Sequence, residues 1–273
     1  MPQPALKKLD SKWQRWLPSP FLRGSVLFQL AGWPLALSGA MPSSCLLEAL
    51  LLNHLLVFAA GLRPQDTWLG PNLVRLPQFS RVRGEVALTF DDGPDPEVTP
   101  WVLDMLDRHH AKATFFCIAE RARRYRGLVH EIAARGHRVE NHSDRHGTLF
   151  ALQGPRALYE DLSRAQDTLS ELTGRTPSFF RAPFGIRNPW VIPVLGRLNL
   201  RLVSWTRRGY DAVLGNSEIV TRLLLRNLCG GDILLLHDGS CARDRQGQPV
   251  VKEVLPRLLD EVSRLHLHPA HLT

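Results

Sequence analysis

Short apolar runs and longer amphipathic segments alternate along the chain from residue 85 onward. The apolar runs predict strands over residues 85–90, 113–118, 137–142, 179–182, 201–206 and 232–237. Between them the periodicity predicts helices over about 99–110, 120–135, 155–173, 189–198, 217–228 and 250–264. Because a helix separates each pair of successive strands, we expect parallel strands, arranged as an open doubly wound sheet or as a (β/α) barrel.

The pattern is different before residue 62. From Phe21 to Gly61 the only formal charges are Arg23 and Glu48, and a break at Gly39-Ala40-Met41-Pro42 divides this stretch into two apolar runs. Each run is close to the ~20 residues that cross a bilayer. The bend carries no charge, whereas basic residues flank the two runs: Lys7, Lys8, Lys12 and Arg15 before them, and Arg63, Arg75, Arg81 and Arg83 after them.

Residues 1–62 are therefore interpreted as an apolar helical hairpin in a membrane, with both flanks and the remainder of the chain on the cytoplasmic face. If one run alone spans, the body lies on the other face. The alternative is a soluble helical subdomain, because Arg23, Glu48, Asn53 and His54 are costly inside lipid. Residues 63–84, rich in Pro, Arg and polar residues, are predicted to be a linker, and residues 85–273 a catalytic domain.

Composition adds few constraints. Apolar content of 44% and charged content of 22% are ordinary for a globular protein. The net charge of +8 is spread along the chain except at residues 121–126, interpreted as a solvated helix face. No nucleic-acid-binding motif accompanies it, so no nucleic-acid partner is predicted. The four cysteines form no CxxC pair, and a bridge between Cys229 and Cys241 stays open.

The unusual polar residues follow the predicted strands. Nearly every one falls at the carboxyl end of a strand: Asp91-Asp92, His142-Ser143-Asp144-Arg145-His146, Arg181-Ala182-Pro183-Phe184-Gly185, Asp211 and His237-Asp238-Gly239. A parallel α/β barrel builds its active site at that edge. We therefore expect these side chains to meet.

The chemistry of this set points to a metal ion. Two adjacent carboxylates repel unless a cation neutralises them, although Asp-Asp-Gly-Pro is also common turn chemistry. His142 and His146, four residues apart, can converge on one ion with Asp92, and two histidines with one carboxylate suit Zn²⁺ and similar ions. Asp91 is then free to act as a general base.

Two further pairs are expected. His237 is placed to protonate a leaving amine, its alternative being a satisfied core histidine. Asp211 can hold the His237 ring and raise its pKa. Arg181 can orient Asp91, whether for catalysis or as a structural ion pair.

Together these residues resemble a known family. Thr-Phe-Asp-Asp-Gly at 89–93, His-Ser-x-x-His at 142–146, Arg-x-Pro-Phe-Gly at 181–185, Trp205 with Asp211, and Leu-x-His-Asp at 235–238 are similar, in this order, to the motifs of the polysaccharide deacetylase family (NodB homology domain, carbohydrate esterase family 4). The similarity covers about residues 84–265. It implies a deformed (β/α) barrel and metal-dependent hydrolysis of N-acyl, usually N-acetyl, amino sugars.

The resemblance also assigns roles. It implies that Asp91 is the base and His237 the acid, and that Asp92, His142 and His146 bind a divalent metal, zinc with cobalt or nickel as alternatives. Phe184 would offer its backbone N–H to the oxyanion, and Leu235 would line the pocket for the acyl methyl. One departure concerns the substrate: the family often has Trp after the residue matched to Asp211, whereas this chain has Ala212.

The predicted function is removal of N-acetyl groups from amino sugars of a poly- or oligosaccharide. A deacetylase or deformylase of a lipid-linked amino sugar is the alternative, since the hairpin and the basic linker suit an anionic, lipid-anchored substrate. From another class, a catalytically silent carbohydrate-binding protein would retain the fold without the reaction. Absence of a Gly-x-Ser-x-Gly motif argues against a serine esterase.

Overall fold

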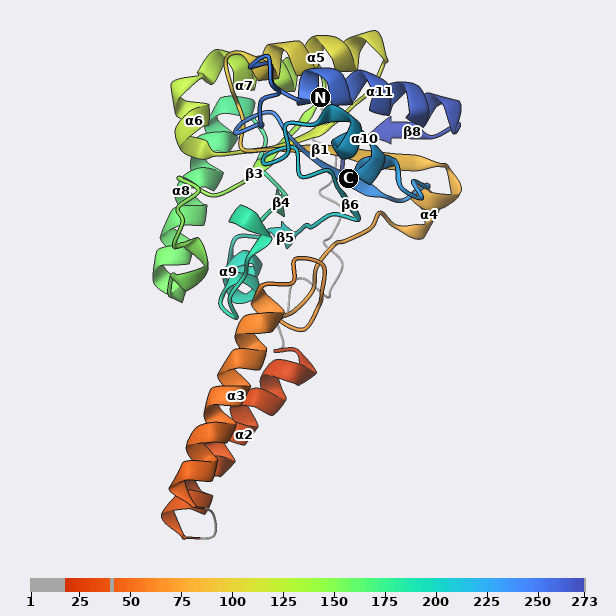
Figure 1. Cartoon of the computed structure of the whole chain (residues 1–273). Helices are drawn as coiled ribbons and strands as arrows, with labels where there is room; N and C mark the ends of the chain where they lie inside the picture. Colours follow the sequence, from red (N-terminus) through yellow and green to blue (C-terminus); the bar gives the residue numbers. More distant parts are fainter. Residues whose placement is uncertain (1–17, 40–41, 273) are drawn as a thin grey trace.

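The chain forms a rounded α/β body from which a helical hairpin projects (Figure 1). The computed structural model describes residues 18–39 and 42–272. The basic residues before position 18 and the centre of the bend, Ala40-Met41, lie outside the described residues.

The hairpin consists of α2 (Pro20–Leu37) and α3 (Ser43–Gly61), which lie side by side (Figure 1). The Ser19 hydroxyl caps α2 by accepting from the Leu22 amide at 3.1 Å. Asn53 Nδ2 donates to Ser25 Oγ at 2.9 Å, so two polar side chains satisfy each other between the helices. The expected apolar helical hairpin is therefore present.

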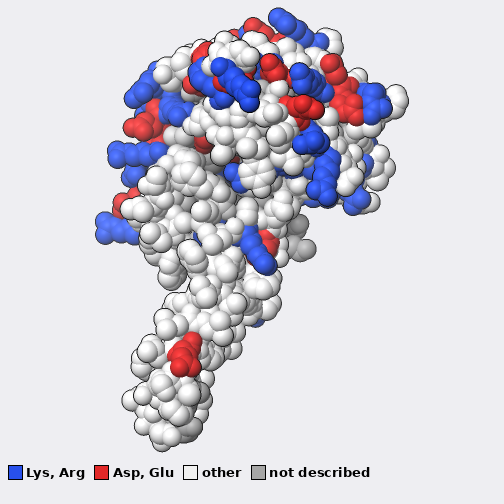
Figure 2. Space-filling view, in the orientation of Figure 1, with Lys and Arg blue, Asp and Glu red and all other residues white. Residues whose placement is uncertain are grey.

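Apolar side chains cover most of the outside of the hairpin. In Figure 2 charged groups crowd the body, whereas the projecting hairpin is almost bare of them. Among the described helices, α3 is the one long and apolar enough to cross a membrane, and 17% of that stretch is buried. The remaining apolar surface has no partner within the described residues, which is unusual for a protein surrounded by water.

The body is built on a parallel sheet. Its strands are β1 (Glu85–Asp91), β2 (Thr114–Cys117), β3 (Arg138–Asn141), β4 (Phe179–Phe180), β5 (Arg201–Leu202), β6 (Arg207–Arg208), β7 (Ile233–His237) and β8 (His268–Ala270). The spatial order is β5-β4-β3-β2-β1-β7-β6, with β8 pairing with the start of β1. All pairings between these strands are parallel.

This sheet must curl. From β5 to β6 the order contains six strand-to-strand steps, which in a flat sheet would separate the edges by about 29 Å. Yet β5 ends at Leu202 and β6 begins at Arg207, and five extended residues span at most about 18 Å. The two edges are therefore drawn together, and the expected deformed (β/α) barrel is confirmed.

Helices surround the sheet: α5 (Val98–Arg108), α6 (Ala119–Arg124), α7 (Arg126–Ala134), α8 (Pro155–Thr173), α9 (Val191–Arg197), α10 (Ser217–Leu225) and α11 (Val251–Arg264). Each long helix buries one stripe; α11 buries Val251, Val254, Leu255, Leu258, Leu259 and Val262. The helix expected over residues 120–135 is two helices, because the backbone breaks at Tyr125 (φ −118°, ψ 50°).

Residues 63–84, expected to be a linker, lie against the body. Leu73 pairs with Val203 beyond the end of β5, and the Leu76 amide donates to the Gly231 carbonyl at 2.9 Å. The segment ends in α4 (Gln78–Val82), and Leu69 and Leu76 are buried. This stretch therefore joins the base of the hairpin to the sheet.

Candidate active site

Strand register brings the predicted residues to one edge of the sheet. Asp91, the last residue of β1, pairs with His237, the last residue of β7. His142 follows the end of β3, and Arg181 follows the end of β4. Side chains far apart in sequence therefore meet at the carboxyl ends of the strands, as expected of a parallel barrel.

Asp92, His142 and His146 form a compact donor set. Asp92 Oδ1 lies 3.2 Å from Nε2 of His142 and 3.2 Å from Nε2 of His146. One possible ligand atom from each of the three residues lies within 4.8 Å of the others. Two imidazole nitrogens and one carboxylate oxygen, closely spaced on a wall of the barrel, suit a divalent ion with open positions for water and substrate.

The backbone around this set is unusual. Asp92, Ser143 and His146 all have positive φ (70°, 68° and 52°), although none of them is glycine. Such conformations cost of order 1–3 kcal/mol each and persist where their surroundings over-determine them. Ser143 helps to fix the conformation of His146, because the Ser143 hydroxyl accepts a hydrogen bond from the His146 amide at 2.9 Å. The strained backbone therefore lowers the stability of the fold, and in return it orients these side chains toward one another.

Electrostatics favour a cation at this position. Burial disfavours the Asp92 anion, yet hydrogen bonding and attraction from His142 hold the pKa of Asp92 well below its ordinary value. Burial, helped by the neighbouring His142, lowers the pKa of His146 to about 4, so its ring is neutral, the form that binds metals. His142 Nδ1 lies 2.8 Å from the Arg181 carbonyl, which leaves Nε2 free to act as a ligand. The residues fit a divalent metal.

Arg181 is the centre of a buried network. Its Nη1 donates to Asp91 Oδ1 at 2.7 Å and to Thr89 Oγ1 at 2.8 Å, and its Nη2 donates to the Ser204 carbonyl at 3.0 Å. The guanidinium also lies 4.2 Å from the ring centroid of Phe116. The expected contact with Asp91 is therefore observed, and the arginine fixes that carboxylate in place.

His237 and Asp211 form the second expected pair. Asp211 Oδ1 lies 2.9 Å from His237 Nδ1, and Asp211 Oδ2 accepts from the His237 backbone amide at 2.7 Å. Burial opposes protonation, but the Asp211 carboxylate outweighs it and raises the pKa of His237 to about 9. A protonated imidazole with its Nδ1 engaged keeps Nε2 available to donate.

The two residues expected around the acyl group differ in setting. Leu235 is buried in a cluster that includes Phe116 and Trp205. Phe184 is half exposed, has a positive φ of 59°, and its ring centroid lies 4.6 Å from that of His146. Phe184 and Trp205 also line a cleft of about 580 Å³ beside the donor set.

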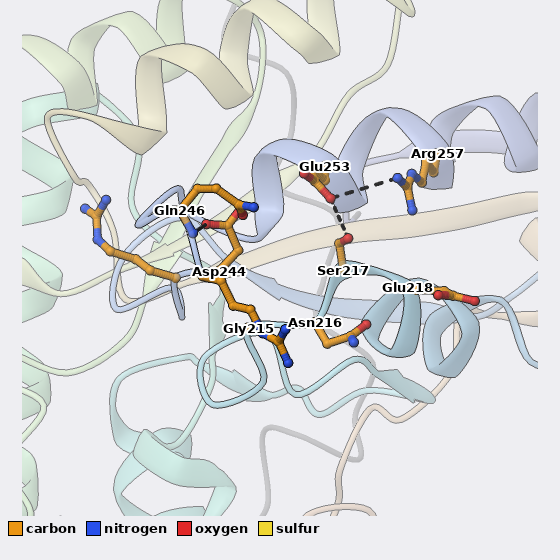
Figure 3. Close-up of a pocket in the computed structure, with 10 residues that line it drawn as sticks. Gly215, Asn216, Ser217, Glu218, Asp244, Gln246, Glu253 and Arg257 are labelled. Atoms are coloured by element: carbon orange, nitrogen blue, oxygen red, sulfur yellow. Dashed lines mark hydrogen bonds and ion pairs between the residues drawn. The ribbon is translucent and has the colours of Figure 1, made fainter.

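A second hollow, of about 570 Å³, contains none of these residues. It lies between the loop before α10, the turn at residues 243–246 and α11 (Figure 3). Its lining includes no histidine or cysteine, and its Glu253 is engaged by the Ser217 hydroxyl at 2.5 Å and lies 3.9 Å from Arg257. We therefore assign it no chemistry.

Sequence reasoning missed several contacts. Arg121, interpreted as part of a solvated face, donates to the Asp92 carbonyl at 2.8 Å and to Ser240 Oγ at 3.3 Å, so it connects the loop after β1 to the loop after β7. Arg123, two residues later on α6, forms an ion pair with the buried Asp144 at 2.7 Å. Gly93 has no room for a side chain, since a Cβ would meet Asp238 Oδ2 at 2.2 Å. All four cysteines are free thiols, so no bridge joins Cys229 and Cys241.

Comparison with known proteins agrees with this geometry. A family model described as polysaccharide deacetylase matches residues 80–203. A peptidoglycan-N-acetylglucosamine deacetylase of Listeria monocytogenes is 35% identical over 170 residues, which cover 62% of this chain and 36% of that protein. The chain thus spans about a third of the length of this relative.

Two further proteins match over more of their own length. A chitooligosaccharide deacetylase of Azorhizobium caulinodans is 36% identical over 163 residues, covering 59% of this chain and 77% of that protein. The structure of a family 4 carbohydrate esterase from Streptomyces lividans, in complex with acetate, superposes with a TM-score of 0.62 at 27% identity. It covers 70% of this chain and 93% of that one. The chain belongs to the polysaccharide deacetylase family.

Proposed function

We propose that this protein hydrolyses the N-acetyl group of an amino sugar in a glycan that contains N-acetylglucosamine. The observation that carries the proposal is the meeting, at one edge of the sheet, of the Asp92–His142–His146 donor set with Asp91 held by Arg181 and with His237 held by Asp211. The names of the Listeria and Azorhizobium relatives support this substrate class.

The metal would be held by Asp92, His142 and His146. When bound, such an ion polarises a carbonyl oxygen and acidifies a water molecule. Zinc fits the donor set, and cobalt or nickel would fit it as well.

The residues of the chain supply the proton transfers. Asp91, fixed by Arg181 at 2.7 Å, accepts a proton from the water that attacks the acetyl carbonyl carbon. The carbon–nitrogen bond then breaks, and protonated His237 gives its proton to the departing sugar amine. The products are acetate and a free amine. We assign stabilisation of the oxyanion to the backbone N–H of Phe184 and contact with the acetyl methyl to Leu235.

The experiment measures release of acetate and amine from N-acetylglucosamine oligomers by the full chain in detergent with added Zn²⁺. We expect Asp91→Asn to lower kcat by a factor of 10² or more, as loss of a general base does. The matched control is Asp260→Asn, since Asp260 is exposed on α11, and it should leave the rate unchanged. Equal rates for wild type and Asp91→Asn would contradict the proposal.

A second candidate is the same reaction on a lipid-linked amino sugar, either deacetylation or deformylation. The observation that favours it is the apolar hairpin, whose base joins the body beside the cleft lined by Leu62, Pro64 and Gln65. A catalytically silent carbohydrate-binding protein is the contrasting class. It would bind the oligomer with the same affinity in wild type and Asp91→Asn and release no amine from either.

A further inference from the structure

The cleft next to the donor set has a basic and aromatic lining. It is bounded by the chain leaving the hairpin, by the segment after β5 and by α10, and its lining includes Leu62, Pro64, Phe184, Trp205, Arg208 and Arg226. Phe184 joins it to the active site, because the Phe184 ring packs against His146. A molecule in the active site can therefore extend into this cleft.

The lining contains three arginines and no carboxylate. Arg207 is occupied: its Nε bonds to Asp232 at 2.9 Å and its Nη2 donates to the Asn227 carbonyl. Arg208 and Arg226 form no ion pair within the part of the chain that the structure describes. The Arg208 guanidinium instead lies over the rings of Trp205 and Tyr210, at 5.3 and 4.6 Å from their centroids.

This environment is suited to an anion. Arg208 Nε is buried without a hydrogen-bond partner among the described residues. A buried donor that is left unsatisfied is costly, and an anionic oxygen would satisfy it. Guanidinium groups stacked on aromatic rings present their N–H edges to phosphate in a fixed plane.

The position of the cleft indicates where such an anion would come from. Leu62 and Pro64 lie within three residues of the end of α3, the helix that is long and apolar enough to cross a membrane. Gln65 donates to the Trp205 carbonyl at 2.8 Å, and the Arg187 amide donates to the Gly61 carbonyl at 3.0 Å, so the base of the hairpin is fixed to the cleft wall. The anion is therefore expected at the boundary between membrane and body.

We propose that Arg208 and Arg226 bind a phosphate group attached to the acylated amino sugar, and that this phosphate carries the sugar on a lipid. This inference rests on the proposed deacetylation and narrows its substrate class. The sugar would occupy the site of Asp91 and His237, its phosphate would lie in the cleft, and the lipid chain would run along the hairpin.

The test compares two synthetic substrates with the same octyl chain, one joined to N-acetylglucosamine through a phosphate diester and one joined through a neutral glycosidic bond. The full chain in detergent should have the higher kcat/KM for the phosphate-linked compound. Arg208→Gln and Arg226→Gln should each lower the ratio of the two kcat/KM values by about 10- to 100-fold, as loss of a charge-assisted hydrogen bond does. Arg222→Gln, an exposed arginine one turn earlier on α10, should leave the ratio unchanged. An unchanged ratio in both cleft variants would overturn the proposal.

A binding measurement separates this inference from the proposed reaction. Calorimetry with Asp91→Asn measures the affinity for the phosphate-linked compound without turnover. Weaker binding when Arg226→Gln is added to Asp91→Asn would support the phosphate subsite. If wild type at the same time released no acetate, the subsite would stand and the proposed deacetylation would be contradicted. Equal binding with and without Arg226 would overturn the subsite.

Two further binding experiments identify the kind of molecule that carries the phosphate. Inorganic phosphate should compete with the phosphate-linked compound in wild type and lose this effect in Arg208→Gln. Vesicles containing phosphatidylglycerol should bind all variants alike. Arginine-dependent binding to these vesicles alone, without an effect on the sugar compound, would assign the arginines to bulk lipid headgroups and overturn the proposal.

Discussion

At the scale of single residues, the site is organised by pairs in which one member controls the charge of the other. His142 stabilises the anionic form of Asp92, and Asp211 stabilises the protonated form of His237. Opposite protonation states are therefore maintained within one pocket, which is what a hydrolase with separate base and acid requires.

The first residue-scale prediction concerns Asp211→Asn. The pKa of His237 is raised to about 9, so its acid form should be present below that pH, and activity should fall as the pH rises through about 9. Without the Asp211 carboxylate, burial of the ring is opposed only by Asp91 and Asp92, so the pKa of His237 falls. The alkaline limb of the kcat–pH profile should therefore shift to lower pH by about 1–3 units, as loss of a neighbouring opposite charge does. An alkaline limb at the same pH in both proteins would show that His237 is not the acid.

The second residue-scale prediction concerns the buried pair of Arg181 and Asp91. Arg181→Met should lower the free energy of unfolding by about 3–5 kcal/mol, because it leaves a buried carboxylate without its partner. Urea denaturation of the full chain in detergent measures this loss.

The matched control is Arg164→Met. Arg164 also contacts a buried carboxylate, Asp144, at 3.2 Å, but its side chain is 54% exposed and Asp144 keeps its bond to Arg123. We expect a loss of at most about 1 kcal/mol. Equal losses for the two variants would contradict the central role given to Arg181.

At this scale the sequence was most informative where residue type and strand end coincide. The meeting of Asp92, His142 and His146 could be predicted because the aspartate follows β1 and the histidines follow β3, and the carboxyl ends of parallel strands lie at one edge of the sheet. Arg121 could not be predicted, since one helical arginine among several looks solvated until the fold brings the Asp92 carbonyl to it. The contact of Thr89 could not be predicted either, because its hydroxyl accepts a hydrogen bond from Arg181, which is 92 residues away in the sequence.

At the scale of elements, close packing holds the hairpin together. Gly32 of α2 faces Leu46 of α3 so closely that a Cβ on the glycine would lie 2.7 Å from Leu46 Cδ1. Small residues at such crossings allow helices to approach in a membrane, where burial of apolar surface supplies little driving force.

The element-scale prediction is that Gly32→Leu separates the two helices. The reporter is a disulfide between Ser25→Cys and Asn53→Cys, positions whose side chains are 2.9 Å apart, in a chain whose Cys45 is replaced by serine. Oxidation should cross-link the parent efficiently and the Gly32→Leu version at least about fivefold less, because overpacking displaces the helices. Gly24→Leu is the control, since nothing lies within 4 Å of a Cβ there. Equal cross-linking in all three would contradict the observed packing.

The elements themselves were largely predictable, and the exceptions have physical causes. The helix expected over 120–135 breaks at Tyr125, and the single glycine nearby, Gly127, lies inside the second helix rather than at the break. Strand β6 is two residues long and basic, so it has no alternating pattern. Residues 63–84 contact the sheet mainly through isolated residues such as Leu73 and Gln65, which produce no periodicity.

At the scale of the whole molecule, the hairpin and the body are fixed to each other. Arg187, buried in the body, donates to the Arg63 carbonyl at 2.9 Å and to the Asp66 carbonyl at 3.1 Å. Both helices of the hairpin meet the body at the same end, so its bend is the most distant part of the described chain (Figure 1). If the hairpin is inserted in a membrane, the body lies against one face.

The whole-molecule prediction concerns topology. The basic residues at the base predict that the body faces the cytoplasm and that the bend lies near the opposite face. The test uses a membrane-impermeant thiol reagent and chains that lack Cys45 and Cys229. The reagent should modify Asp260→Cys in inverted membrane vesicles but not in intact spheroplasts. It should modify Gly39→Cys in intact spheroplasts but not in inverted vesicles. A body labelled only from outside would contradict the predicted orientation, and both positions labelled from one side would contradict a spanning hairpin.

The most direct test of the account is a metal titration of the reaction itself. The full chain in detergent is stripped with a chelator, Zn²⁺ is added in steps, and acetate and amine released from N-acetylglucosamine oligomers and from the phosphate-linked compound are counted together. We expect acetate and amine in equal amounts, released by wild type at a rate that rises to a plateau at one equivalent of Zn²⁺. The rate should stay near zero in His142→Ala. The control is His130→Ala, which replaces an exposed histidine on α7 and should behave as wild type. Zn²⁺ bound at one equivalent without release from either compound, or release that does not depend on Zn²⁺, would contradict the account.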